Sequence, residues 1–166
     1  MNNAALIHIW VTKHVTRLHG SNLHVQDNQL LSYATPIAEW VPERQLYILT
    51  RRTYSNTTSR HQSTLRREIL GAKVLYVDAD LPRYDKFLET ATDDVLTTCL
   101  RGDLDRIASD IPRFTRAKSR GTDSSHILQA MQATRRNIEL LRELFPRFTY
   151  LRDKEQSLFR YMDRVL

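Results

Sequence analysis

Residues 30–50 of the chain read LLSYATPIAEWVPERQLYILT, and this stretch decides the expected fold. Three short runs rich in β-branched and aromatic residues, separated by turns that contain proline, lie at residues 30–33, 37–41 and 45–50. The run Leu23–Val25 precedes them across Asp27-Asn28, a pair that tolerates left-handed backbone angles and suits a hairpin turn. Strands that follow one another this closely predict an antiparallel meander.

Elements on either side extend this region. Leu6–Thr12 places apolar residues at alternate positions, which predicts a strand, and Lys73–Asp78 predicts another. The Ser/Asn/Thr-rich stretch 54–62 can cap a helix from about Ser59 to Leu70. Gly71 fits the left-handed position that often follows a helix. We therefore expect one helix packed on the sheet.

The second half of the chain has a helical pattern. Three short helices are expected, from Pro82 to about Thr92, from Asp93 to about Gly102, and from Asp103 to Ser109. Residues 111–122 contain Pro112, Gly121 and four basic side chains, which predicts an exposed linker or basic loop.

The last forty residues give the clearest helical signal. Ser124 or Ser125 can cap a helix that runs to Phe145, with apolar residues spaced by four and three positions. Pro146 ends or kinks this helix, and residues 151–165 predict a second one. These two helices form either a hairpin packed within the chain or the seam of a homodimer.

The expected fold class is α+β. An N-terminal antiparallel meander with one packed helix precedes an α-helical C-terminal half that ends in a helical hairpin. We place a β-rich domain at residues 1–80 and a helical region at 81–166, and the two could also form one continuous unit.

Composition narrows the class of protein. The single cysteine, Cys99, excludes a disulfide framework and a cysteine zinc site within one chain, and its apolar surroundings predict a buried position. No run approaches 18 apolar residues, so no membrane span is expected. The first residues lack the pattern of a secretory signal, and the expected location is the cytoplasm.

The net charge of +6 is unevenly distributed. The net charge is +5 over residues 1–77, −5 over residues 78–110 and +6 over residues 111–166, and arginine outnumbers lysine 20 to 5. The planar guanidinium fork suits phosphate, carboxylate and aromatic partners. A basic surface of this kind attracts polyanions or an acidic face of another protein.

The arginines concentrate in one stretch that lacks acidic residues. From position 44 to position 67 there are six arginines and one histidine, and a helix N-terminus in this stretch could also hold an anion. The four basic residues of the loop predicted at residues 111–122 form a second candidate group. The candidate nucleic-acid or partner-binding residues are Arg44, Arg51, Arg52, Arg60, His61, Arg66, Arg67, Arg113, Arg116, Lys118 and Arg120.

The sequence gives weaker evidence for a catalytic or metal-binding site among the other polar residues. Ser59 or Ser63 near His61 lacks the Gly-x-Ser-x-Gly pattern of a serine nucleophile, so a helix cap is the favoured interpretation. The histidines show no metal-binding spacing, and the four glycines form no phosphate-binding loop. Asp78 and Asp80 follow a strand, where Mg²⁺ ligands are often placed, although capping is favoured. We predict no catalytic residue, metal or cofactor.

Two motifs carry a resemblance. Residues 30–38 fit the pattern L-x-S-Y-x-T-x-I-A, and residues 54–62 fit Y-S-x-T-T-S-x-H-Q. Over about residues 23–67 the chain resembles a loose group of small uncharacterised proteins encoded by bacteriophages and related mobile elements. The resemblance implies a viral origin, and through it a role in binding nucleic acid or a host factor. It implies no activity.

Three functions compete. The first is a non-enzymatic phage binding protein that uses its arginine-rich surface to contact nucleic acid or a nucleoprotein, in the host cytoplasm and away from membranes. The second is an inhibitor of a host antiviral defence protein, similar to an anti-CRISPR, that acts by protein–protein contact through the C-terminal helices or the acidic segment. The third is a metal-dependent nuclease that uses Asp78 and Asp80.

Overall fold

The fold comes from a computed structural model, which describes residues 1–165. The chain divides into two compact units, one that spans Met1–Ala91 and one that begins at Thr92. The sequence suggested a division after residue 80. The first unit combines strands and helices and the second is helical, which confirms the expected α+β class.

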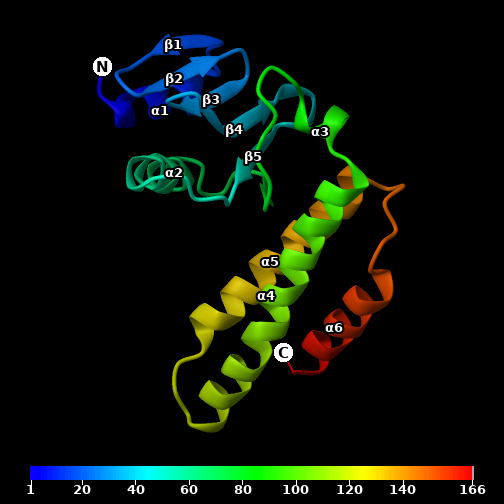
Figure 1. Ribbon diagram of the computed structural model, residues 1–166. Coiled ribbons are helices and arrows are strands. Elements are labelled where there is room, and N and C mark those ends of the chain that lie inside the picture. The colour runs from blue at the N-terminus through cyan, green and yellow to red at the C-terminus, as the bar shows by residue number, and fades with distance from the viewer. Residues whose placement is uncertain (166) are drawn as a thin grey trace. The chain divides into compact units, whose positions relative to one another are not determined.

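The first unit contains a six-stranded sheet whose strands follow the order of the sequence (Figure 1). Its strands are β1 (Arg17–His19), β2 (Leu23–Gln26), β3 (Gln29–Ser32), β4 (Thr35–Val41), β5 (Leu46–Thr50) and β6 (Val74–Val77). The first five pair antiparallel, which confirms the meander, and β6 pairs parallel to β5. At the predicted hairpin Gln26 pairs with Gln29, and Asp27 has a left-handed φ of 52°.

The parallel pairing depends on helix α2 (Asn56–Glu68), because parallel neighbours need a crossover between them. The Ser55 side chain caps this helix by accepting a hydrogen bond from the Thr58 backbone N–H, at 3.1 Å. The helix therefore starts three residues before the expected Ser59. Gly71 follows its end with a φ of +83°, in the left-handed region expected for it.

The predicted strand at Leu6–Thr12 is wrong, because these residues lie in helix α1 (Asn3–Lys13). The Asn2 side chain caps it by accepting a hydrogen bond from the Ala5 N–H at 2.7 Å. Leu6, Ile7 and Trp10 are fully buried, and their spacing places them on one side of a helix. The alternate apolar residues that predicted a strand lie in the same stretch. Helix α1 contacts α2 and β2, so two helices cover this face of the sheet rather than one.

The helix expected from Pro82 to Thr92 is mostly absent, and only α3 (Phe87–Thr90) forms. The segment before it is held to the sheet by the buried side chain of Gln29. The Gln29 Nε2 donates to the backbone carbonyls of Pro82 at 2.6 Å and Asp85 at 3.4 Å. These tertiary hydrogen bonds use carbonyls that a helix would need, so they favour the extended path.

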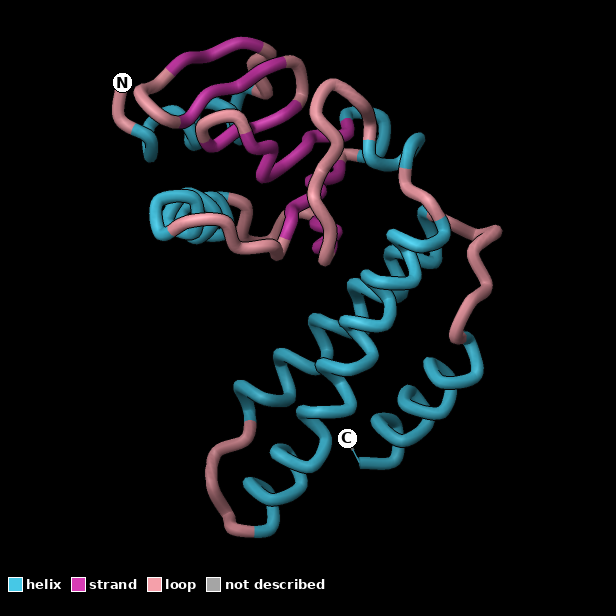
Figure 2. The backbone as a smooth tube through the Cα atoms, in the orientation of Figure 1, coloured by secondary structure: helices cyan, strands magenta, loops and turns pink. Residues whose placement is uncertain are grey.

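The second unit consists of α4 (Asp93–Ser119), α5 (Ser125–Leu144) and α6 (Arg152–Val165) (Figure 2). Helix α4 runs without interruption through Gly102 and Pro112, so the second and third predicted helices are one helix. The basic loop predicted at residues 111–122 is also wrong as far as Ser119. Helix α4 is continuous because its buried side chains, Cys99 among them, keep helical spacing against its neighbours.

Helix α5 forms as predicted and packs along α4, and its buried side chains follow the predicted spacing of three and four residues. Ion pairs hold α6 against it: Arg142 contacts Glu155 at 2.6 Å, and Arg135 contacts Asp163 at 2.6 Å. None of the helices in the described part of the chain is both long and apolar enough to cross a membrane.

Pro112 gives the first testable prediction. This proline is exposed and lies inside α4, where it lacks the N–H of a regular helical hydrogen bond. Replacing Pro112 with alanine should raise the free energy of unfolding of the helical unit by about 1–3 kcal/mol. Chemical denaturation followed by circular dichroism measures this change.

Pro146 provides the matched control, because it is also exposed but lies after the end of α5. Pro146→Ala should lower stability slightly, by about 0.5 kcal/mol, since it only frees the unfolded chain. Equal effects of the two substitutions would contradict a helical path through Pro112.

Candidate nucleic-acid interface

The arginines between positions 44 and 67 do not form one surface. Arg44 lies in the 3₁₀ turn Pro42–Arg44 before β5, whereas Arg51 and Arg52 follow the other end of β5. A five-residue strand at about 3.3 Å per residue separates the two ends by roughly 16 Å. Arg44 is therefore not part of the group near α2.

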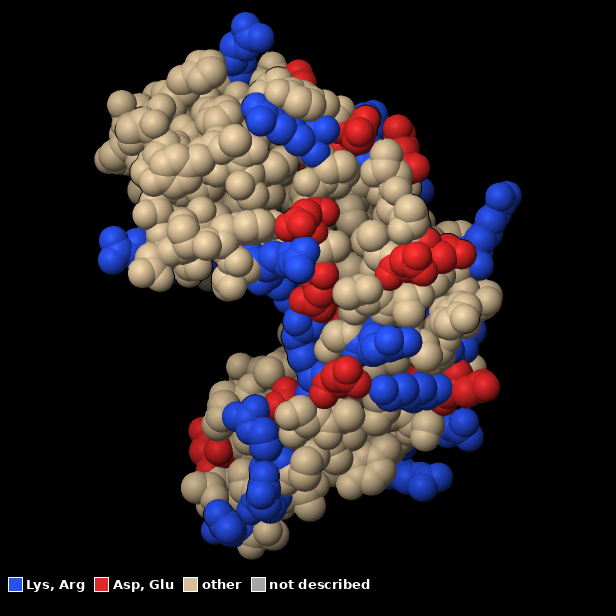
Figure 3. Space-filling view, viewed as in Figure 1, with Lys and Arg blue, Asp and Glu red and all other residues tan. Residues whose placement is uncertain are grey.

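Arg51 and Arg52 both have acidic partners. The Arg51 guanidinium lies 3.8 Å from the Asp78 carboxylate and 5.1 Å from the centre of the Tyr76 ring. The Arg52 guanidinium lies 3.0 Å from the Asp80 carboxylate. These contacts take both arginines out of the uncompensated surface that the sequence suggested. On the face drawn in Figure 3, basic and acidic side chains lie next to one another in several places.

The same contacts bear on the proposed Mg²⁺ ligands Asp78 and Asp80. Strand β6 ends at Val77, so the two carboxylates do not project from a continuing strand. Besides Arg52, the Tyr54 hydroxyl donates a hydrogen bond to Asp80, and burial together with this bond raises the pKa of Tyr54 to about 12. No group of three His, Cys, Asp or Glu side chains within residues 1–165 is arranged to hold a metal ion.

The outer face of α2 carries the arginines that remain. Arg60 and Arg67 are exposed and lie seven positions apart, which places them on one side of the helix. Together with Ser59, Ser63 and Thr64 they line an open depression of about 400 Å³. None of these five residues is acidic. Arg66 lies at the edge of this face and is half-buried.

His61 faces the other way and is only 5% exposed, so it does not belong to a binding surface. Its Nε2 lies 2.9 Å from the Asn3 side-chain amide nitrogen, which donates a hydrogen bond to it. The Nδ1 then carries the proton and donates to the Ser32 hydroxyl, at 2.8 Å. Burial lowers the pKa of His61, which favours this neutral form.

A serine–histidine pair therefore exists, but it is not the pair considered from the sequence. Ser59 and Ser63 line the outer depression, and the partner of His61 is Ser32 on β3. Ser32 is 1% exposed, and its hydroxyl also lies 3.0 Å from that of Thr58. Because substrate could not reach this hydroxyl, the pair acts as a link between α2 and the sheet.

The two sequence motifs meet in this network. Ser32 comes from the first motif, and Ser55, Thr58 and His61 come from the second. Gln62, the last residue of the second motif, donates hydrogen bonds to the carbonyls of Thr50 at 3.1 Å and Arg52 at 2.9 Å. The sequence marked these residues by their pattern but gave no sign that they would contact one another.

The basic residues predicted in a loop at 111–122 lie mainly on α4 instead. Arg113 pairs with Asp110 at 2.6 Å, and the Lys118 ammonium lies 5.9 Å from the centre of the Phe114 ring. Arg116 and Arg120 are exposed and one helical turn apart. They belong to the second unit, whereas α2 belongs to the first.

Comparison with known proteins adds one match. The model of a family of unknown function (DUF8033) matches residues 10–74, which include both motifs and α2. No curated protein and no solved structure matches the chain.

The buried hydroxyl of Ser32 generates a prediction for stability. Ser32→Ala leaves the His61 Nδ1–H without its acceptor in a buried position, which should cost about 1–3 kcal/mol of unfolding free energy. Ser63→Ala on the exposed side of α2 is the matched control, with a change within about 0.5 kcal/mol. Denaturation curves that coincide for the two variants would show that the Ser32 contact does not hold α2.

The buried histidine also predicts a pH dependence. Burial lowers the pKa of His61 below its usual 6.5, so the unfolded chain takes up a proton at higher pH than the folded chain does. Stability should therefore fall as the pH drops below 6.5, down to the lowered folded pKa. Burial lowers the pKa of His14 and His24 as well, so they add to the same decline.

Denaturation at pH 7, 6 and 5 measures this decline in the wild type and in His61→Asn. The variant should lose less stability between pH 7 and pH 5 than the wild type, whatever its absolute stability. An equal loss in both proteins would mean that His61 does not titrate below its usual value.

Proposed function

We propose that this chain is a non-enzymatic binding protein that contacts phosphate groups of a nucleic acid or nucleoprotein through the outer face of α2. One observation carries the proposal. Arg60 and Arg67 share an open depression with three hydroxyl side chains, and no acidic residue lines it.

The chemistry of this face suits phosphate oxygens. Arginine binds phosphate through two parallel N–H donors, and serine and threonine hydroxyls add further donors. The helix that carries these groups is fixed in orientation, because His61 and Gln62 bind its opposite side to the sheet. Contacts of this kind position a nucleic-acid backbone without reading its sequence.

The size of the face sets the expected strength. Two phosphate contacts give a slope of about −2 in a plot of log affinity against log salt for duplex DNA. Such a slope belongs to weak binding that salt readily abolishes. Arg116 and Arg120 at the end of α4 are the next candidates for further contacts.

The origin of the chain is part of the same proposal. The two motifs resemble small proteins of bacteriophages and mobile elements, and the family-model match overlaps both motifs. We infer a phage-encoded protein that acts in the cytoplasm of the host.

A second candidate function is inhibition of a host defence protein by direct contact. It is favoured by a depression of about 270 Å³ on α6, lined by Ser157, Arg160, Tyr161 and Arg164. Tyr161 is 42% exposed, and tyrosine and arginine are enriched in protein–protein interfaces.

The salt dependence of binding tests the leading proposal. In the double variant Arg60→Gln and Arg67→Gln, the slope of log affinity against log salt for duplex DNA should fall by about two. The control, Arg44→Gln with Arg101→Gln, removes the same charge from exposed positions outside the depression and should keep the wild-type slope. Fluorescence anisotropy at several salt concentrations measures both.

Equal slopes for the two double variants would remove α2 from the interface. Affinity purification from the expressing host, with and without nuclease, separates the two candidate functions. A partner that disappears with nuclease supports the phosphate contact, whereas a protein retained after nuclease and lost with Arg160→Gln and Tyr161→Ala supports the α6 face.

A further inference from the structure

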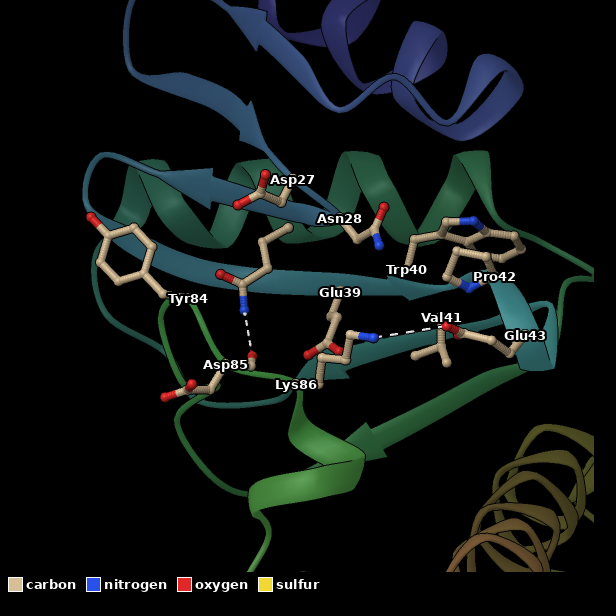
Figure 4. A pocket seen from close by; sticks show the side chains of 11 residues that line it. Asp27, Asn28, Glu39, Trp40, Val41, Pro42, Glu43, Tyr84, Asp85 and Lys86 are labelled. Atoms are coloured by element: carbon tan, nitrogen blue, oxygen red, sulfur yellow. Dashed lines mark hydrogen bonds and ion pairs between the residues drawn. The ribbon is translucent and has the colours of Figure 1, made fainter.

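A pocket lies on the first unit and shares no lining residue with the depression on α2 (Figure 4). It has a volume of about 240 Å³ and is bounded by three segments, Asp27–Gln29, Glu39–Glu43 and Tyr84–Lys86. This volume is below the range of about 300–1,000 Å³ that is usual for drug-sized ligands, so it suits a small molecule. One wall is fixed by Gln29, which is bound to the Pro82 and Asp85 carbonyls.

The pocket is acidic in a chain whose net charge is +6. Four carboxyl side chains line it, those of Asp27, Glu39, Glu43 and Asp85, against the single ammonium of Lys86. That ammonium is already engaged, because it lies 3.8 Å from Glu43 and 3.9 Å from Glu89. The lining thus has an excess of negative charge.

Glu39 is the residue that makes this acidity more than a surface feature. Its side chain is 4% exposed and points from β4 toward the Tyr84–Lys86 segment (Figure 4). One carboxylate oxygen, Oε2, accepts a hydrogen bond from the Phe87 backbone N–H at 3.1 Å. Among the residues that the structure describes, the other oxygen has neither a hydrogen-bond donor nor an ion-pair partner.

The electrostatic setting of Glu39 agrees with this geometry. Burial raises the pKa of the Glu39 carboxyl, and the Glu89 and Glu43 charges raise it further. The Phe87 N–H and the Lys86 ammonium oppose this rise without cancelling it. A positive group in the pocket would offset the cost of keeping this carboxylate charged.

The arrangement of the carboxylates and the apolar lining of the pocket indicate which type of cation it would bind. No three carboxylates of the described residues converge on one point in the way a metal ion needs. The apolar and aromatic part of the lining consists of Trp40, Val41, Pro42 and Tyr84, which favours an organic cation with an alkyl chain. Both aromatic rings of the lining already have partners: Trp40 is 7% exposed and stacks on His14, with ring centres 4.0 Å apart, and the Arg83 guanidinium lies 4.8 Å from the centre of the Tyr84 ring. They therefore suit an alkyl chain better than a methylated cation that needs an aromatic cage.

We propose that this pocket binds a small primary alkylamine, with its ammonium group on the free oxygen of Glu39 and its alkyl chain against Val41 and Pro42. A primary alkylammonium supplies three N–H donors, and each methyl group added to the nitrogen removes one of them. The remaining carboxylates can accept the other donors or a second ammonium of a diamine. The proposal is independent of the phosphate contact on α2, which lies on other residues.

The test is a titration of the full chain with 1,4-diaminobutane and n-butylamine at constant ionic strength, followed by the backbone amide signals in ¹H–¹⁵N NMR spectra. We expect saturable shifts at the amides of Asn28, Val41 and Lys86. Glu39→Gln keeps an acceptor for the Phe87 N–H but loses the charge, and should weaken binding about tenfold or more. Tighter binding of the diamine would identify a polyamine as the ligand class, and equal binding a single ammonium such as a lysine side chain.

Glu68→Gln is the matched control, because it makes the same chemical change on the exposed end of α2. It should leave the affinity within about twofold of the wild type. If Glu39→Gln fails to fold, Asp85→Asn serves in its place, since only the backbone carbonyl of Asp85 holds Gln29. It should weaken binding severalfold.

Three outcomes would overturn the proposal. The first is that the amide shifts do not saturate. The second is that Glu39→Gln, or Asp85→Asn in its place, binds as tightly as the Glu68→Gln control. The third is that tetramethylammonium or neutral 1-butanol produces the same shifts as n-butylamine, since neither carries an ammonium N–H.

Discussion

The rest of the first unit depends on one constraint, namely which side of α2 faces the sheet. Hydrogen bonds from His61 to Ser32 and from Gln62 to the Thr50 carbonyl fix this orientation, and Leu65 adds apolar contact on the same side. Because a helix turns about 100° per residue, burying these positions forces Arg60 and Arg67 outward. The polar network in the core therefore determines which side chains reach solvent.

The parallel pairing of β6 with β5 explains why part of the expected positive surface is neutralised. Two adjacent parallel strands end at the same edge of a sheet, so the residues that follow them become neighbours. Here Arg51 and Arg52 follow β5 while Asp78 and Asp80 follow β6, and each arginine lies beside a carboxylate. Local charge counts along the sequence cannot show this, since the partners are 27 and 28 residues apart.

The sequence predicted those elements whose signals are local. The Asp27-Asn28 turn and the apolar stripe of α5 depend only on neighbouring residues, and both form as expected. Residues 6–12 were misassigned because Ile7, Ile9 and Val11 alternate as in a strand, whereas the residues that are buried, Leu6, Ile7 and Trp10, share one side of a helix. The Asn2 cap that decides for a helix lies before them. Helix α4 was divided because Pro112 and Gly102 break helices in isolation, whereas packing against α5 sustains them. The buried partners of His61 could not be predicted from local patterns either, because Asn3 and Ser32 are distant from it in sequence.

The two proposed sites of the first unit should respond differently to their surroundings because their charges are buried to different degrees. Arg60 and Arg67 are exposed, so mobile ions screen them over about 8–10 Å at moderate ionic strength. Glu39 is 4% exposed, and screening ions cannot surround a buried carboxylate in the same way. Salt should thus weaken phosphate contact on α2 more than amine contact in the pocket. A protein with both sites would therefore release a nucleic acid when the salt concentration rises and still retain a small cation in the pocket.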